Sequence, residues 1–130
     1  MQPNPLARWH QLVATQDLRA LEEIVDEAAV FLSPAVHAPQ RGRALVCTYL
    51  RAALGLLDNA TFRYTDEWVG ETSAVLQFEL KLGDVDVNGV DLIRWNAAGA
   101  IVEFKVMIRP LKALTTVVAL MGAQLAAKPA

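Results

Sequence analysis

The pattern that decides the fold lies in the stretch Val90-Asp91-Leu92-Ile93-Arg94-Trp95. It is typical of a strand, in which successive side chains point to opposite faces of a sheet. Arg94 is the natural solvent-facing residue of this run, so we expect Asp91, Ile93 and Trp95 to share the inner face. An ionised carboxylate in an apolar interior is costly. Asp91 should therefore be paired, protonated or facing a cavity.

Three more strand-like runs surround this stretch, and short turns separate them. The four runs span residues 61–70, 72–82, 85–96 and 100–109, with Gly70, Gly83 and Gly99 at the connections, and we interpret these glycines and Gly89 as turn or bulge residues. Alternation assigns an inner face to each run. The inward side chains that it predicts are Phe62, Tyr64, Asp66, Trp68, Leu76, Phe78, Leu80, Val102, Phe104, Val106 and Ile108.

Helical spacing dominates the first half of the chain and its last segment. We expect a helix over 6–14, a short helix capped by Asp17, a strand over 27–33 that ends at Pro34, and a long helix from about residue 43 to Asp58. The long helix should bury Leu45, Tyr49, Ala52 and Leu56.

A last helix should follow Pro110 and pack over the open side of the sheet through Leu111, Leu114, Val118, Met121 and Leu125. This helix is apolar nearly all round, which indicates a partner surface and most often a homodimer. The order of elements predicts an α+β fold in which a curved antiparallel or mixed sheet wraps around three to four helices.

Length and composition narrow the functional classes. The 130 residues fit one domain, 1–130, and 12 basic and 14 acidic residues are interleaved without a basic stripe, so nucleic acid is an unexpected partner. Cys47 is the single cysteine and is expected to be a buried helical thiol. The sequence shows no metal-ligand spacing and no phosphate-binding loop, so we expect neither a metal nor a cofactor. Without a signal-peptide pattern or a membrane-length apolar run, a cytoplasmic location is expected, with no membrane association.

Three stretches give the sequence a resemblance to a known superfamily. They are the helix pair that runs into Asp17-Leu18, the segment 30–34 followed by a loop and Arg41-Gly42-Arg43, and residues 89–103. In order and spacing they resemble the nuclear transport factor 2-like superfamily, which includes SnoaL-like polyketide cyclases and ketosteroid isomerases. The resemblance implies a cone-shaped sheet, a cystatin-like α+β roll, with helices closing one side and an interior pocket.

The catalytic residues of the ketosteroid isomerases can be compared with the matching positions of this sequence. Those enzymes use an aspartate base just before the proline of the first strand, with a tyrosine and a protonated aspartate as oxyanion donors. By position, Asp91 falls on the oxyanion aspartate, Ser33 on the base and Trp9 on the tyrosine. Serine has no useful basicity near neutral pH without an adjacent base. Ketosteroid isomerase activity is therefore not expected.

Two functional hypotheses remain open at this point. In the first, the protein is a SnoaL-like enzyme of isomerase, cyclase or hydratase type in which Asp91 is the acid or hydrogen-bond donor and loop residue His37 is a candidate for proton transfer. In the second, it is a non-catalytic ligand-binding or dimerisation module, with Asp91 paired to a buried donor such as Trp9, Tyr64 or an arginine, His37 solvated and His10 on the surface. Either way, the expected ligand is a small hydrophobic molecule, and the predicted pocket residues are Trp9, Phe31, Ser33, Tyr49, Tyr64, Asp66, Trp68, Phe78, Ile93, Phe104, Val106 and Ile108.

Overall fold

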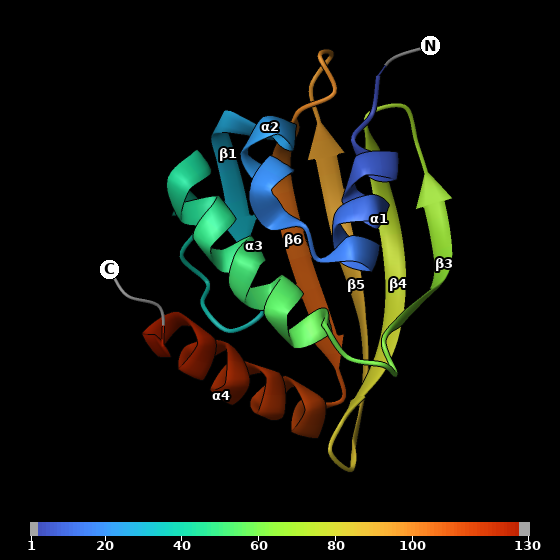
Figure 1. Cartoon of the computed structure of the whole chain (residues 1–130), viewed down its shortest axis with the longest axis vertical. Coiled ribbons are helices and arrows are strands. Elements are labelled where there is room, and N and C mark those ends of the chain that lie inside the picture. Colours follow the sequence, from blue (N-terminus) through green and yellow to red (C-terminus); the bar gives the residue numbers. More distant parts are fainter. Residues whose placement is uncertain (1–2, 128–130) are drawn as a thin grey trace.

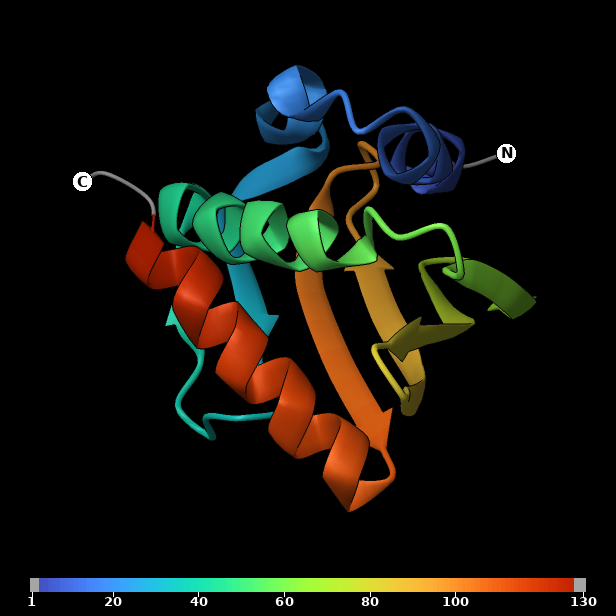
Figure 2. The same cartoon turned by 60° about the horizontal axis from the view of Figure 1, so that its bottom comes forward.

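A six-stranded mixed sheet curves around the helices, which all lie on its concave side (Figure 1 and Figure 2). The structure, a computed structural model, describes residues 3–127. Strand order is β2-β1-β6-β5-β4-β3, with β1 parallel to β6 and the other neighbours antiparallel. The elements are α1 (Leu6–Thr15), a 3₁₀ turn (Leu18–Ala20), α2 (Leu21–Ile24), β1 (Val25–Leu32), β2 (Gln40–Arg41), α3 (Arg43–Leu57), β3 (Arg63–Val69), β4 (Ser73–Leu82), β5 (Val85–Trp95), β6 (Ile101–Arg109) and α4 (Leu111–Ala127).

These elements confirm the predicted α+β architecture, including the four long strand runs of the second half. The first connection also follows the prediction, because the Asp17 side chain accepts a hydrogen bond from the backbone N–H of Arg19 at 3.3 Å and so caps the 3₁₀ turn. The loop expected after the first strand contains the short strand β2, which pairs with β1. The sheet remains open at β2 and β3, so it forms a cone rather than a closed barrel.

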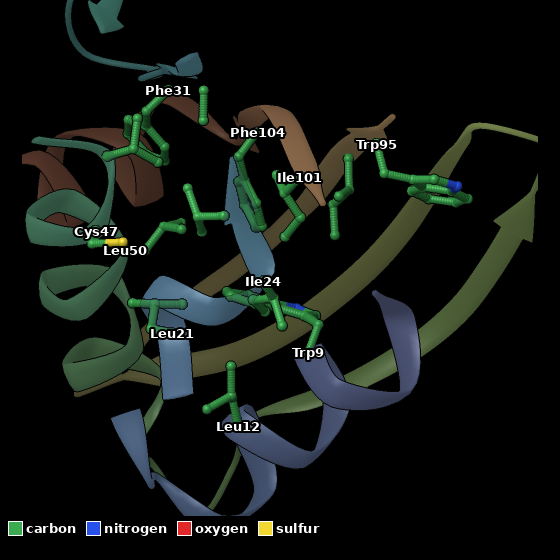
Figure 3. Packing of buried hydrophobic residues seen from close by; sticks show 14 of the residues in the cluster. Trp9, Leu12, Leu21, Ile24, Phe31, Cys47, Leu50, Trp95, Ile101 and Phe104 are labelled. Atoms are coloured by element: carbon green, nitrogen blue, oxygen red, sulfur yellow. The ribbon is translucent and has the colours of Figure 1, made fainter. Parts of the chain in front are cut away.

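The main core lies between the sheet and helices α1, α2 and α3. Figure 3 shows Trp9 of α1 and Leu50 of α3 turned toward the sheet residues Ile101 and Phe104. The rings of Trp9 and Phe104 lie 4.9 Å apart, and Phe31 stacks between Phe104 and Tyr49. Burying a side chain of this size stabilises a fold by about 1.5–3 kcal/mol, so this cluster fixes α1 and α3 on the sheet.

The buried face of α3 differs from the predicted one. Leu45 is 40% exposed, whereas Val46, Cys47, Leu50 and Leu54 are fully buried. Apolar residues occupy several sides of this helix, so periodicity alone does not select one stripe, and packing against β1 and the sheet decides it. The predicted buried thiol of Cys47 is confirmed.

A β-bulge in β3 overturns the predicted orientation of Asp66 and Trp68. Tyr64 pairs with Phe78 and points inward, but the next paired residue is Asp66, which lies opposite the outward Gln77. The extra residue at this point reverses the alternation for the rest of the strand. Asp66 and Trp68 are therefore exposed, and Trp68 is 55% accessible.

Gly89 is neither a turn nor a bulge residue, in contrast to the prediction. It lies within β5, directly opposite Phe78 of β4. A Cβ at this position would stand 2.5 Å from Cζ of Phe78 and 2.7 Å from the carbonyl oxygen of Met107. The glycine therefore allows the Phe78 ring to lie flat across the strand on the concave side.

Candidate functional site

A cavity of about 240 Å³ lies within the cone. Its walls come from the inner face of the sheet, from α3 and α4, from Trp9 of α1 and from the loop after β1. Its lining is apolar except for the indole N–H of Trp9 and the polar groups of Ser33, Tyr49 and Asp91. Among the predicted pocket residues, those on the wall are Trp9, Phe31, Ser33, Tyr49, Phe78, Asp91, Phe104, Val106 and Ile108.

Five predicted site residues lie elsewhere. Asp66 and Trp68 are on the outer face because of the bulge in β3. Ile93 is fully buried in the core beside the cavity, and Tyr64 lies behind Asp91. His37 is exposed and does not contribute to the wall, although its loop does.

Much of the helical part of the wall was not predicted from the sequence. Strand alternation located the sheet residues, but the cavity also borders two helices and the start of the loop after β1. The helical spacing of Val118, Met121 and Leu125 was a usable signal, since it predicted that α4 covers the open side of the cone. The wall residues outside the predicted set are Pro34, Ala35, Val36, Leu50, Ala53, Leu56, Leu57, Leu80, Leu82, Val87, Val117, Val118, Met121, Gly122 and Leu125.

Asp91 is the one charged group of the wall, and its position follows from the register of β5. It lies between Leu76 of β4 and Val106 of β6, so its immediate neighbours in the sheet are apolar. The side chain is 4% exposed. Across residues 3–127 it forms no ion pair, so the arginine partner that was one of the alternatives is absent.

A short chain of hydrogen bonds holds Asp91. The hydroxyl of Tyr64 donates to Oδ2 of Asp91 at 2.7 Å, and Nε1–H of Trp9 donates to the Tyr64 hydroxyl oxygen at 2.9 Å. An indole N–H can only donate, so the order of donors is fixed from Trp9 through Tyr64 to Asp91. Within residues 3–127 the other carboxyl oxygen, Oδ1, has no hydrogen-bond partner, and it keeps some solvent-accessible surface. Asp91 is thus both paired with a buried donor and part of the cavity wall.

Burial shifts the ionisation of both partners. The apolar surroundings raise the pKa of Asp91 from 3.8 to about 7, while the hydrogen bond from Tyr64 acts in the opposite direction. Burial, and then the neighbouring charge of Asp91, raise the pKa of Tyr64 well above 10. Near neutral pH, Asp91 can therefore be present in both its charged and its neutral form, whereas Tyr64 keeps its proton.

The wall offers no base beside Asp91. The hydroxyl oxygen of Ser33 accepts a hydrogen bond from the backbone N–H of Ala35 at 3.0 Å, which closes a turn after β1. His10 is partly exposed and pairs with Glu67 at 2.6 Å, next to the Tyr64 ring but outside the cavity lining. No group of three or more metal-ligating side chains occurs within residues 3–127. In the same part of the chain, no helix has both the length and the apolarity that crossing a membrane requires.

Comparisons with known proteins identify the family of this fold. A family model of the SnoaL-like domain matches residues 6–104. A crystal structure of a steroid delta-isomerase from Pseudomonas aeruginosa is similar with 35% identity, coverage of 93% of this chain and 88% of that one, and a TM-score of 0.86.

Two further solved structures extend the comparison. An uncharacterised protein with a cystatin-like fold from Silicibacter pomeroyi has 29% identity, coverage of 98% and 89%, and a TM-score of 0.86. A nuclear transport factor 2-like protein of unknown function from Mesorhizobium loti, at 23% identity, coverage of 81% and 88%, and a TM-score of 0.69, supports the fold alone. No curated protein matches the sequence significantly. The chain therefore belongs to the SnoaL-like domain family of the nuclear transport factor 2-like superfamily.

Proposed function

We propose that this protein binds a small hydrophobic or cyclic molecule in the cavity, with Asp91 as its acid or hydrogen-bond donor. The observation that carries the proposal is a single buried carboxyl on an apolar wall, held by Tyr64 and with Oδ1 left without a partner. An apolar cavity with one convergent polar group is the usual form of a small-molecule site. Trp9 and Tyr64 act through Asp91, because their own polar atoms are already engaged.

The hydrogen-bond order indicates what kind of group Asp91 would recognise. Because Oδ2 accepts from Tyr64, the proton of neutral Asp91 belongs on Oδ1, where it can be donated to a ligand. A carbonyl oxygen on an otherwise apolar ligand is a suitable acceptor. In an isomerase, cyclase or hydratase-type reaction, this O–H would stabilise the negative charge that develops on that oxygen.

Non-catalytic binding is the alternative, and Ser33 favours it. Proton abstraction needs a base within hydrogen-bond reach of the reacting carbon. The wall has a serine where the ketosteroid isomerases, by the resemblance, have their aspartate, and His37 is exposed outside the wall. A protein that binds the same ligand without converting it would need only Asp91 and the apolar lining.

Two measurements with one ligand separate these alternatives. Prodan, a neutral naphthyl ketone, is a suitable test compound, to be followed by steroid-like and polyketide-like ketones. Carboxyl NMR, with Asp91→Asn to assign the signal, should show a pKa near 7 that the ketone perturbs. A pKa near 4 that no compound shifts would refute the proposal. Exchange of the hydrogens next to the ketone in D₂O should be accelerated only if the protein is an enzyme.

The proposal also includes a homodimer formed through the convex face of the sheet. In the register, Trp68 lies beside Val75 and Val75 beside Leu92, while Val90 lies beside Met107. All five side chains point away from the helices, and Trp68 and Met107 are more than half exposed. The apolar pattern of the last helix predicts a partner surface there instead, and α4 does expose Leu111, Val118 and Leu120.

Charge and area favour a second copy as the occupant of the convex face. Six of its charged residues form mixed pairs around the apolar centre, Arg63 with Glu79, Lys81 with Asp86 and Arg94 with Glu103, which reduces like-charge repulsion between two copies. Four strands of about ten residues present about 650 Å², close to the roughly 800 Å² per partner of a standard interface. Light scattering should give a dimer mass for the wild type and a monomer mass for Met107→Lys, whereas Leu120→Lys on α4 should remain dimeric. The reverse result would place the interface on α4.

The cytoplasm is the proposed location, and Cys47 supports it. A single buried free thiol suits a reducing compartment, where disulfides are rare. Fractionation of the native host would test this part of the proposal.

A further inference from the structure

The cavity wall changes from buried to exposed along its length. At one end, Trp9, Asp91 and Phe104 are almost inaccessible to solvent. At the other end, Val36 is 47% exposed and Val118 is 38% exposed, and both still line the cavity. The exposed end is therefore the mouth, and it lies between the loop after β1 and the middle of α4, which lie beside each other in Figure 1 and Figure 2.

The rim of this mouth is small and uncharged. Its exposed wall residues are Ala35, Val36, Val118 and Gly122. None can form an ion pair or a side-chain hydrogen bond, so the rim selects by size and not by charge. Such a rim favours a neutral apolar ligand, because it offers no polar partner to a charged one.

Helix α4 supplies half of this rim and lies outside the segment that the family model matches. The family match ends at residue 104, whereas α4 begins at Leu111. Among the described side chains of α4, Ala113 alone is fully buried, and the hydroxyls of Thr115 and Thr116 bond to carbonyls of the same helix. Within residues 3–127, α4 makes no side-chain hydrogen bond or ion pair with another element, so apolar packing alone holds it against α3, β5 and β6.

Gly122 leaves an unfilled position on the rim. A Cβ built there would have no heavy atom within 4 Å outside its own helix and chain neighbours, and its φ lies outside the positive range that disfavours side chains. Val118 precedes it by four residues, so the two lie one above the other on the same side of the helix. Ala123 is rotated by about 100° from Gly122, is exposed, and does not line the cavity.

We propose that Val118 and Gly122 are specificity-determining residues that set the width of the mouth and hence the largest ring system that the cavity admits. This inference rests on the proposed ligand-binding function. It assigns selection by size to α4 and recognition of the ligand's acceptor to Asp91, so the two steps can be separated by experiment. Steric exclusion at a rim discriminates between ligands of different width without any new attractive contact.

The experiment compares Gly122→Phe with its neighbour Ala123→Phe, using stopped-flow fluorescence of Prodan. Gly122→Phe should slow association at least about ten-fold, whereas Ala123→Phe should stay within about two-fold of the wild type. Val118→Ala should widen the mouth and raise association of the bulkier neutral dye Nile red relative to Prodan. Circular dichroism melting checks folding, and replacing a helical glycine should not lower the melting temperature.

The outcomes distinguish this inference from the proposed function. Equal association rates in Gly122→Phe and Ala123→Phe would overturn the role of the rim. Asp91→Leu should instead weaken binding through faster dissociation while leaving association unchanged, because leucine has a similar branched shape but offers the ligand no hydrogen-bond donor. Unchanged affinity in that variant would overturn the role of Asp91. A wild-type protein that binds neither dye would overturn both.

Discussion

Replacing Asp91 by asparagine should stabilise the protein, and increasingly so as the pH rises. The pKa of Asp91 is raised from 3.8 to about 7 in the folded protein, so folding favours the protonated form. The contribution of Asp91 to stability is therefore fully present below pH 3.8, and it is lost as the pH rises toward 7. A difference of about three pH units between the folded and unfolded pKa values corresponds to about 4 kcal/mol above pH 7. Asparagine has nearly the same shape, can still accept the hydrogen bond from Tyr64 and carries no charge to bury.

The assay is urea unfolding of both proteins from about pH 4.5 to about pH 8.5. The free energy of unfolding of Asp91→Asn minus that of the wild type should rise by about 3 kcal/mol over this range, because other titrating groups cancel in the difference. Asp66→Asn is the matched control, since it removes an exposed carboxylate from the outer face. A difference that stays flat with pH, or that falls as the pH rises, would show that the carboxyl is not held in an apolar environment.

Three further substitutions test the packing and hydrogen bonding of the interior. Tyr64→Phe should raise the pKa of Asp91 further, because the hydrogen bond that favours the charged form is lost. The free energy of unfolding measured in urea should fall by about 1–3 kcal/mol. An unchanged titration of the Asp91 carboxyl would argue against that bond. Gly89→Ala should lower the free energy of unfolding by at least about 1–3 kcal/mol in the same assay, because the new methyl group would overlap Phe78. A variant as stable as the wild type would mean that the Phe78 ring has room to move. Trp95→Phe should lower the melting temperature less than Trp9→Phe, because both remove similar buried volume but within residues 3–127 only the Trp9 indole N–H has a hydrogen-bond partner. An equal or larger loss in Trp95→Phe would reveal a bond to its indole N–H.

The strands were the most predictable part of the fold. In β4 and β5, buried and more exposed side chains alternate along the strand, and a register error would expose the buried set, so the inner face could be assigned from sequence. In β3 the same assignment was wrong beyond Thr65, because one extra residue at the bulge places Asp66 and Trp68 on the outer face. An edge strand has a partner on one side only and tolerates such a bulge, and no local residue type announces it.

The site was predictable on its sheet side and less so on its helical side. Asp91 could be assigned to the concave face because strand phase and resemblance agreed. Its pairing with Tyr64 instead of an arginine depends on β3 lying two strands away, which local spacing does not encode. The face that α3 and α4 present to the cavity depends on tertiary packing, because both helices are apolar on several sides.

The fixed order of donors behind Asp91 has a kinetic consequence. Trp9 has no proton that it can release at ordinary pH, and the one proton of Tyr64 is donated to Asp91. These hydrogen bonds therefore cannot carry a proton between Asp91 and bulk water. Asp91 must therefore gain and lose its proton through the cavity itself. A ligand that fills the cavity would seal this route, and the carboxyl would keep for the lifetime of the complex whichever protonation state it had when the ligand arrived.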